Sequence, residues 1–530
     1  MPLLFKTICD LLSNVESLRK AQPPLLAATV CQKTNAHTKR WCQNLNLSIN
    51  STDIDAVALL STLFPKRRTD RVYGIQPRSL SRKLKRILGL GDGRHQLLDE
   101  WQEAGHGDLG CCVERALRQA EFPLQPQSRQ ITNEEIDDML ASIAGGYRYS
   151  APKVRAAASS VTEQDVDDQL RSLYRRTQSR EAKWLTRLIL KDYGAVEIPE
   201  WMVFRSIDPR LPLVLKIHDT FEDAIRLLRS GKFATDGDSL MPLVGVKVGR
   251  TTYTKARSVK HAVSMIRNRD MSVERKYDGE YCQIHVDVRR RDEQIQLFSK
   301  SGKDSTADRI GLHDTLKHCL NLGKETCVFS SKCILEGEMV IWSDRDKEIL
   351  PFHKIRKHVS RSGSFLGTKA DSMPHHYEHL MIVFYDVLLV DDVSCLQCTH
   401  TSRRRLLKRI VSQIPGRAEL AAQCNIDFTC PGAPEQLRNH YAHAITKRWE
   451  GLVLKPLDEP YFGPAKISPD DPPSCWLKLK KDYIAGLGDT ADFAVVGAGY
   501  CVKAAARCPL ADVRWTHFHI GCLKNKDAVI

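Results

Sequence analysis

The chain has 530 residues and carries 79 Lys and Arg against 64 Asp and Glu, which gives a formal net charge of +15. One hydrophobic core stops growing well below this length, so we expect several domains. The excess of positive charge favours a polyanionic partner such as nucleic acid over an acidic small molecule.

Membrane and disulfide-rich classes are disfavoured by the apolar residues and the cysteines. The sequence has no run of about 18 apolar residues to span a bilayer, and its first residues lack the apolar core of a signal peptide. The 17 cysteines are scattered and odd in number, which favours reduced thiols in a soluble intracellular protein with no membrane partner. Cys395 and Cys398 precede His400, but a zinc site needs a second pair, so we interpret these cysteines as incidental.

The first part of the chain, to about Arg229, has a helical and basic pattern. Apolar residues recur at helical spacing within residues 56–63, 84–88 and 184–189. Lys and Arg cluster within residues 66–71, 82–86 and 175–180. Each cluster alone fits a solvated helix face equally well. Because the clusters repeat, we predict a surface that neutralises nucleic-acid phosphates regardless of base sequence.

The pattern changes near residues 235–238, where period-two segments and Gly-bounded turns replace the helical spacing, so we place a domain boundary there. Residues 282–288 alternate between apolar and polar side chains, which predicts a half-buried strand. Lys276 and Gly279 precede this strand, and the glycine permits a tight turn. Lys276 is therefore either a solvated surface lysine or a nucleophile, and a nucleophilic lysine must be uncharged.

Charged residues also share strand faces further along the chain. Glu336 and Glu338 alternate in one predicted strand, so their carboxylates need a metal ion or lysines to balance them unless that face is solvated. Lys478 and Lys480 alternate in another, where a phosphate would relieve their repulsion. Lys300 adds a further cation near a turn that follows a short strand.

Six segments, in this order, resemble the ordered motifs of ATP-dependent DNA ligases. They are Lys276-Tyr277-Asp278-Gly279, Phe298-Ser299-Lys300, Glu336-Gly337-Glu338, Phe384-Tyr385-Asp386, Glu450-Gly451-Leu452-Val453-Leu454-Lys455 and Trp476-Leu477-Lys478-Leu479-Lys480. The helical region resembles the DNA-binding domain of this family, and residues 63–75 are most similar to its DNA ligase IV-like branch.

The resemblance implies a multidomain fold. We expect an all-α DNA-binding domain in residues 1–235, an α+β adenylation (nucleotidyltransferase) domain in residues 236–485 and a partial β OB-fold in residues 486–530. Residues 492–497 resemble the first strand of that OB-fold, but the remaining residues are too few for a complete barrel. The last motif of the family has no match, so we expect either a fragment or an impaired first reaction step.

The activity that the resemblance implies is sealing of nicks in duplex DNA through AMP carried on Lys276. ATP and Mg²⁺ would be the cofactors, and nicked or broken DNA the main partner. A nuclear location and a role in DNA repair, recombination or replication would follow, with repair-complex proteins as further partners. Each reaction step is an in-line displacement at phosphorus, which depends more on positioning and charge neutralisation than on acid–base chemistry.

The same resemblance implies roles for ten residues. Lys276 would be the catalytic nucleophile, and Glu338 and Glu450 would hold Mg²⁺ and orient the nucleotide. The expected nucleotide-binding residues are Glu274, Tyr281, Lys300, Glu338, Tyr385, Glu450, Lys455, Lys478 and Lys480. Lys478 and Lys480 would contact the α-phosphate, and Tyr385 would stack on adenine.

This chain departs from the family pattern at two of these positions. Tyr281 stands where the family ordinarily has an arginine, which removes a cation with two fixed donors, and Lys300 also replaces an arginine. One alternative function is therefore a catalytically weak, ligase-like DNA-binding or scaffolding protein. Another is an RNA-capping type guanylyltransferase, which has a similar lysine and fold but leaves the basic helical region unexplained.

Overall fold

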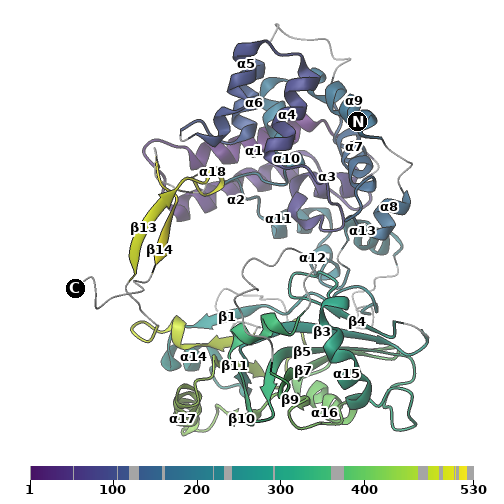
Figure 1. Ribbon diagram of the computed structural model, residues 1–530, viewed down its shortest axis with the longest axis vertical. Coiled ribbons are helices and arrows are strands. Elements are labelled where there is room, and N and C mark those ends of the chain that lie inside the picture. The colour runs from purple at the N-terminus through teal and green to yellow at the C-terminus, as the bar shows by residue number, and fades with distance from the viewer. Residues whose placement is uncertain are drawn as a thin grey trace. The chain divides into compact units, whose positions relative to one another are not determined.

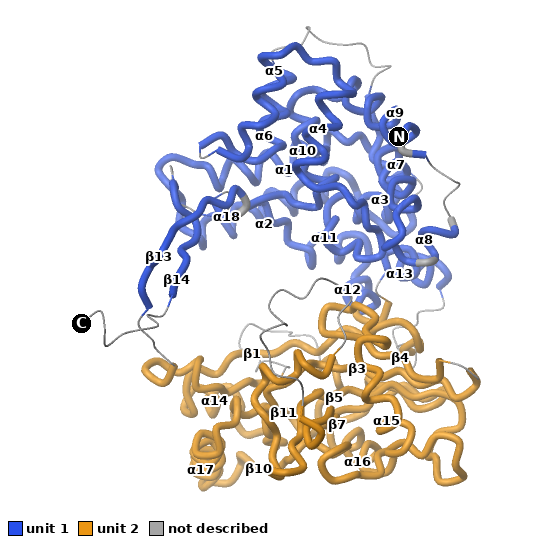
Figure 2. The backbone as a smooth tube through the Cα atoms, in the orientation of Figure 1, with its two compact units in different colours: residues 1–215, 220–231, 491–530 blue, residues 216–219, 232–490 orange. Residues whose placement is uncertain are grey.

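The computed structural model describes residues 2–530 except 52, 104, 119–129, 158–161, 219, 232–240, 291–292, 360–374, 464–475, 489–492, 506–507, 509–512 and 522–530. The chain forms two compact units (Figure 2). Unit 1 comprises residues 1–215, 220–231 and 491–530, and unit 2 comprises residues 216–219 and 232–490. The boundary predicted at residues 235 and 236 lies outside the described residues. Each unit is described by itself below.

Unit 1 consists mainly of short helices (Figure 1). They are α1 (Phe5–Arg19), α2 (Ala27–Asn44), α3 (Ala56–Leu63), α4 (Pro77–Leu88), α5 (Asp92–Leu97), α6 (Leu109–Arg118), α7 (Asn133–Gly145), α8 (Pro152–Ala157), α9 (Glu163–Arg176), α10 (Ser179–Ile189), α11 (Glu200–Ile207), α12 (Leu211–Val214) and α13 (Phe221–Arg229). The three apolar segments of the sequence lie in α3, α4 and α10 and are buried, so those helix predictions are confirmed. Local signals define their ends, since the Asp55 side chain caps α3 and Gly89 ends α4 in the left-handed region.

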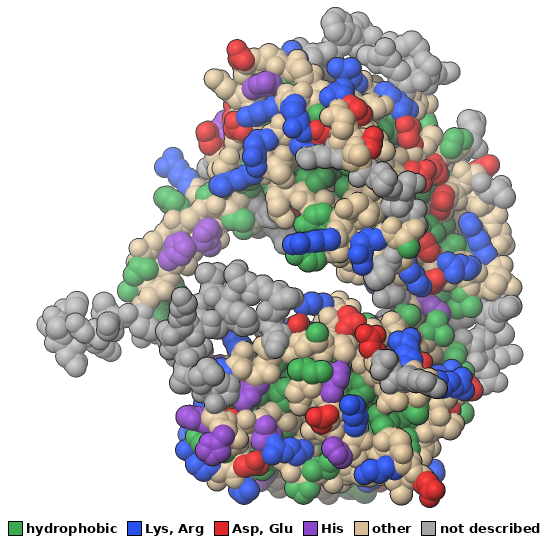
Figure 3. Space-filling view, turned by 45° about the vertical axis from the view of Figure 1, so that its right-hand side comes forward, with side chains coloured by type: hydrophobic (Ala, Val, Ile, Leu, Met, Phe, Trp, Pro, Cys, Tyr) green, Lys and Arg blue, Asp and Glu red, His purple; other side chains and the backbone are tan. Residues whose placement is uncertain are grey.

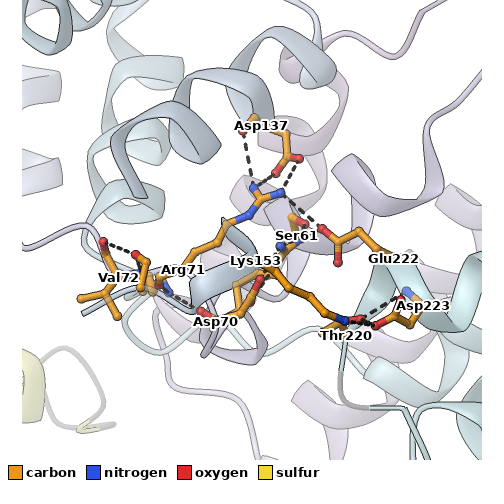
Figure 4. A network of polar contacts seen from close by, with 12 residues as sticks. Ser61, Asp70, Arg71, Val72, Asp137, Lys153, Thr220, Glu222 and Asp223 are labelled. Atoms are coloured by element: carbon orange, nitrogen blue, oxygen red, sulfur yellow. Dashed lines mark hydrogen bonds and ion pairs between the residues drawn. The ribbon is translucent and has the colours of Figure 1, made fainter. Parts of the chain in front are cut away.

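Buried ion pairs connect the helices of unit 1 (Figure 4). The Arg71 guanidinium donates to both carboxylate oxygens of Asp137 in α7, over 2.6 and 3.1 Å. Arg68 lies 2.7 Å from Asp70 and 2.7 Å from Glu222 in α13. Both guanidinium groups are buried. The cluster at residues 66–71 therefore holds helices together, and for Arg68 and Arg71 the predicted phosphate contact is wrong.

The other two basic clusters are also largely neutralised within unit 1. Lys83 and Arg86 of α4 both pair with Asp167 of α9, and Lys85 pairs with Asp99. In the third cluster, Arg176 pairs with Glu135 and Arg180 with Asp10. Figure 3 shows basic and acidic side chains interspersed on the visible face of this unit. Most cations of these clusters thus serve packing, because a carboxylate already occupies the position that a phosphate would take.

Unit 1 also contains a β-hairpin and a short helix from the end of the chain. Strands β13 (Ala494–Gly499) and β14 (His517–Gly521) pair antiparallel, and α18 (Val502–Ala505) lies between them in sequence. The strand predicted at residues 492–497 is present as β13, although residue 492 lies outside the described residues. No described helix is both long enough and apolar enough to cross a membrane.

Unit 2 contains two mixed sheets. One has the strand order β1 (Tyr253–Ala256), β12 (Trp476–Leu479), β11 (Gly451–Pro456), β2 (Asp270–Lys276) and β10 (Gln423–Asp427). The other follows the path β4 (Ile295–Phe298), β3 (Glu280–Asp287), β5 (Lys332–Ser343), β7 (Glu378–Val390) and β8 (Val393–Ser394), with β6 (Glu348–Ile349) beside β5 and β9 (Ala418–Leu420) beside β7. The turn at residues 277–279 carries the chain from β2 in the first sheet to β3 in the second.

Helices cover both sheets of unit 2 (Figure 1). Helices α14 (Val259–Ile266) and α17 (Ala433–Thr446) pack with the five-stranded sheet around one apolar core. Helices α15 (His313–Cys319) and α16 (His400–Ile410) pack with the larger sheet around a second core. Residues of β2, β3, β5, β7, β11 and β12 also line a cavity of this unit.

Strand β3 is buried on both faces, which corrects the prediction of a half-buried strand. Its polar residues Gln283 and His285 are as fully buried as its apolar ones. The Gln283 amide donates to the Val248 carbonyl over 3.0 Å and its oxygen accepts from the Val248 N–H over 2.7 Å. The oxygen lies 3.0 Å from His285 Nε2. Alternation in the sequence therefore reflects a buried polar layer, not a solvent-facing one.

The Asp137 and Arg71 pair gives a stability prediction. We expect Asp137→Ala to lower the free energy of unfolding by about 3 kcal/mol, because it leaves a buried guanidinium without its main partner. Urea unfolding of the whole chain, followed by far-ultraviolet circular dichroism, measures the loss. The double variant Arg71→Met/Asp137→Leu should lose much less, and Asp138→Ala, an exposed neighbour, should be nearly neutral. Equal losses in the single and double variants would contradict this account.

His285 gives a prediction about pH. Burial lowers the pKa of its imidazole to about 3, and Lys247 adds to the effect. The unfolded chain then binds a proton below about pH 6.5 that the folded chain does not, so this group makes stability fall as pH drops from 6.5 toward 3. The slope is about 1.4 kcal/mol per pH unit. Urea titrations at pH 7.5 and 5 should show a smaller difference for His285→Gln than for the parent chain, and an unchanged difference would refute the assignment.

Candidate active site

A cavity of about 830 Å³ in unit 2 brings the predicted site residues together. The residues that line it include all ten of them: Glu274, Lys276, Tyr281, Lys300, Glu338, Tyr385, Glu450, Lys455, Lys478 and Lys480. They come from strands of both sheets and from the loops beside those strands. Segments that lie more than two hundred residues apart in the sequence therefore meet around Lys276.

Two glycines permit the backbone approach that positions Lys276. Gly279, in the turn after Lys276, has no room for a side chain, since a Cβ there would lie 2.8 Å from Glu338 Cγ and closer still to the Met339 carbonyl. Gly451 pairs with Lys276 in the sheet and has a φ of +142°. Gly279 is thus required for close packing of the turn on β5, which differs from the predicted need for a special backbone conformation.

Glu450 is shared by two lysines of the site. Its carboxylate accepts hydrogen bonds from Lys276 Nζ through one oxygen and pairs with Lys480 Nζ through the other. The Lys480 pKa is raised, because this carboxylate outweighs burial, which acts in the opposite direction. The candidate nucleophile is therefore held by the same carboxylate that is predicted to bind a metal ion.

Four further cations in the cavity have no carboxylate within ion-pair distance among the described residues. They are Arg250, Arg275, Lys300 and Lys478. Burial lowers the pKa of Lys478 to about 8, and repulsion from Lys276 and Arg250 contributes. Lys478 Nζ lies 3.6 Å from the centre of the Tyr253 ring. So many cations beside one another favour an anionic ligand with several charges, such as a polyphosphate.

Glu338 lies half-buried in the same wall and lacks a balancing cation of its own. Its pKa is raised to about 7, because burial and the Glu450 carboxylate together outweigh the opposing charge of Lys276. No group of three or more potential metal ligands exists among the described residues. Two carboxylates beside a phosphate site nevertheless fit Mg²⁺, which usually binds through one or two carboxylates, substrate phosphates and water.

The opposite end of the cavity is aromatic and contains a buried ion pair. Lys455 Nζ lies 2.8 Å from Glu274 Oε2, and 4.2 and 4.9 Å from the centres of the Trp476 and Tyr385 rings. Burial alone would raise the Glu274 pKa, but Lys455 and His400 lower it well below its usual range. His400 Nε2 lies 3.0 Å from the other Glu274 oxygen. A flat ring can stack against Tyr385 here beside fixed charges.

Two tyrosine hydroxyl groups hold the buried Glu336 carboxyl in the wall of the cavity. The Tyr281 hydroxyl donates to one oxygen of Glu336, and the Tyr461 hydroxyl donates to the other over 2.9 Å. The Gln283 amide donates to the Tyr281 oxygen over 2.8 Å. Burial raises the pKa of Glu336. Neutral hydroxyls therefore satisfy Glu336, which corrects the expectation that cations or a metal balance both carboxylates of this strand.

Sequence reasoning missed several residues of the cavity. Arg250, Tyr253 and Tyr461 line it, but none lies in a recognised motif. His400 was considered only as part of a zinc pattern with Cys395 and Cys398, whereas the structure pairs it with Glu274. Only the residue type of His400 could have indicated this contact. A histidine beside arginines on an amphipathic helix is a weak indication of burial next to an acidic partner.

Two family models match the chain. The model described as "ATP dependent DNA ligase domain" matches residues 252–480, and that described as "DNA ligase N terminus" matches residues 4–197. Together these matches cover most of the chain. The first includes all ten predicted site residues, and the second covers most of the helices of unit 1.

Individual relatives agree with the family models. DNA ligase 4 of Dictyostelium discoideum is 24% identical over 489 residues, which is 83% of this chain and 41% of the relative. DNA ligase 4 of Homo sapiens is 24% identical over 466 residues, 84% of this chain and 44% of the relative. The chain thus spans less than half the length of these relatives.

The solved ATP-dependent DNA ligase from bacteriophage T7 in complex with ATP is 19% identical to this chain. The match has a TM-score of 0.29 and covers 43% of this chain and 68% of that chain. The chain belongs to the ATP-dependent DNA ligase family.

Proposed function

We propose that this chain seals nicks in duplex DNA through AMP carried covalently on Lys276. The observation that carries the proposal is the position of Lys276, which shares one cavity with seven other charged residues of the predicted site, a set suited to a nucleoside triphosphate and a metal ion. Residues 1–235 act as the DNA-binding domain, 236–485 as the adenylation domain and 486–530 as part of an OB-fold. Nuclear DNA repair, together with repair-complex proteins, is the setting that the DNA ligase 4 relatives support.

The first step is a displacement at the α-phosphorus of ATP. Lys276 leaves its ion pair with Glu450 and loses one proton to solvent, and the nitrogen lone pair then forms a bond to phosphorus. The nitrogen loses a second proton to solvent as the phosphoramidate forms. The bond from that phosphorus to the bridging oxygen breaks, and pyrophosphate leaves with the electron pair. Lys478 and Lys480 lie on one face of β12 and neutralise the charge that develops on the phosphoryl oxygens.

The nucleotide base occupies the aromatic end of the cavity. Adenine stacks on Tyr385, whose ring is held in place by Lys455 and Trp476. The Lys455 and Glu274 pair is fully buried, so it presents fixed charges to the nucleotide at little entropic cost. Glu338 and Glu450 would hold Mg²⁺, which supplies charge neutralisation to the phosphates when bound.

The second and third steps use the same pocket. AMP passes from Lys276 to the 5′-phosphate at the nick, which breaks the phosphorus–nitrogen bond and returns the lysine. The adjacent 3′-hydroxyl then attacks the activated phosphate, loses its proton and expels AMP, and the strand is joined. Lys276, Lys300 and Lys478 remain beside the reacting phosphates in both steps.

Tyr281 stands in place of an arginine. This departure favours a second candidate function, that of a catalytically weak ligase that chiefly binds DNA.

The nucleophile can be tested directly. Incubated with labelled ATP and Mg²⁺, the whole chain should acquire AMP through a bond that is labile to acid and stable to base, as expected of a phosphoramidate. Lys276→Arg should abolish the label, because a guanidinium does not lose its proton. Mass spectrometry of the labelled peptide identifies the attachment site.

The matched control is Lys447→Arg, at an exposed lysine outside the cavity, which should charge like the parent chain. Equal labelling of Lys276→Arg would sink the assignment of the nucleophile. Labelling by GTP in preference to ATP would favour the capping-type alternative, and DNA binding without any labelling would favour the scaffold.

The cations that remain for DNA can also be tested. Arg78 and Arg82 of α4 are exposed and have no carboxylate partner among the described residues, whereas Lys85 of the same helix pairs with Asp99. Arg78→Gln/Arg82→Gln should weaken binding of duplex DNA and reduce the slope of log affinity against log salt by about 0.9 per lost phosphate contact. Lys85→Gln should change the slope little. Titrations by fluorescence anisotropy at several salt concentrations measure both, and identical slopes in all three proteins would place the DNA surface elsewhere.

A further inference from the structure

Arg250 lies over the ring of Tyr281, the residue that departs from the family pattern. Its guanidinium carbon is 5.4 Å from the centre of that ring. Arg250 precedes β1 and belongs to none of the six motifs, yet its side chain lines the same cavity as Lys276. A guanidinium from a separate segment is therefore present at the position where the motif itself has lost one.

The Tyr281 ring is a rigid support for this guanidinium. Only 6% of Tyr281 is exposed, and its hydroxyl is held by Glu336 and by the Gln283 amide. The hydroxyl contacts fix the far end of the side chain, and burial leaves the ring little room to turn about its long axis, so its face stays directed toward Arg250. Stacking on an aromatic face orients a guanidinium while leaving its N–H donors available.

The surroundings of Arg250 favour an anionic ligand. No carboxylate among the described residues lies within ion-pair distance of it. Arg250 lines the cavity together with Lys478, Glu338 and Tyr385, and its charge lowers the pKa of all three. A planar fork of donors beside two lysines fits the oxygens of a phosphate better than any other part of a nucleotide.

We propose that Arg250 is a catalytic residue of the charging step that binds an oxygen of the α-phosphate of ATP, and that Tyr281 is the positioning residue that holds it. This inference rests on the proposed function. Arg250 supplies the pair of N–H donors that the motif lacks because Tyr281 stands in place of an arginine. The buried Glu336 carboxyl contributes indirectly, because it fixes the Tyr281 hydroxyl. The departure at position 281 is then compensated within the site.

The test measures the single-turnover rate of AMP transfer to Lys276 at saturating labelled ATP. Arg250→Ala should lower this rate about 10²–10³-fold, the usual effect of removing one charge-stabilising contact. Arg250→Lys keeps the charge without the fork and should recover only part of the loss. Arg257→Ala, at an exposed arginine outside the cavity, should charge at the parent rate.

Chemical rescue separates a phosphate contact from a packing role. Added guanidinium ion, at concentrations far below those that unfold proteins, should accelerate Arg250→Ala by at least about tenfold and leave the parent chain unchanged. The rescue should persist in Arg250→Ala/Tyr281→Phe, which keeps the ring, and disappear in Arg250→Ala/Tyr281→Leu, which removes it. Loss of an ordinary packing contact would not respond to a soluble guanidinium.

The outcomes distinguish this inference from the proposed function. If the parent chain does not charge at all, the proposed function fails. If it charges and Arg250→Ala charges at the same rate, Arg250 has no part in the step. Arg250→Ala could instead charge slowly and show no rescue while Arg250→Lys keeps full activity. That result would show that only the positive charge matters and would overturn the role of the paired N–H donors. Rescue that is equal with leucine at position 281 would overturn the role of Tyr281.

Discussion

Burial of like charges in one cavity is the constraint on which the site depends. Lys276, Lys478 and Lys480 converge from two strands of one sheet, and such a group of cations is unfavourable unless carboxylates or a ligand balance it. Glu450 balances two of the three by bridging Lys276 and Lys480. The charged form of Lys478 is disfavoured, because burial and repulsion from neighbouring cations lower its pKa. The positive charge that the protein's own carboxylates leave unbalanced in this cavity favours a polyphosphate.

Glu274, Glu336 and Glu338 of unit 2 differ in the partners that surround their carboxylates. Glu274 is ionised and locked between Lys455 and His400, so it forms a permanent part of the wall. Glu336 is held by hydroxyl groups and serves as a fixed anchor for a tyrosine. Glu338 has neither kind of partner among the described residues, and burial raises its pKa although Lys276 opposes the shift. An anion left without its counter-charge is the feature expected of a residue that awaits a cation.

The motifs could be found from the sequence because each is local. Alternation placed Lys478 and Lys480 on the face opposite Leu477 and Leu479, and the structure confirms both faces. Local pattern could not show whether a second layer covers a strand, so β3 was expected to be half-buried although Gln283 and its neighbours are enclosed on both sides. The contacts of His400 and Arg250 depend on segments that lie far apart in the sequence, and such pairs leave no trace in periodicity.

Net charge predicted an anionic partner but could not locate the surface that binds it. Clustering in sequence was expected to mark that surface, yet the clusters are where helices of unit 1 meet, and Arg71 and Arg68 are buried against Asp137, Asp70 and Glu222. Basic residues in adjacent turns are close to several neighbouring helices at once, so they are well placed to join them. Arg82, which lies in one of these clusters, and Arg78, which lies outside them, are exposed on α4 without a carboxylate partner among the described residues. For a helical domain of this kind, the informative quantity is therefore the charge left after internal pairing, which only the structure provides.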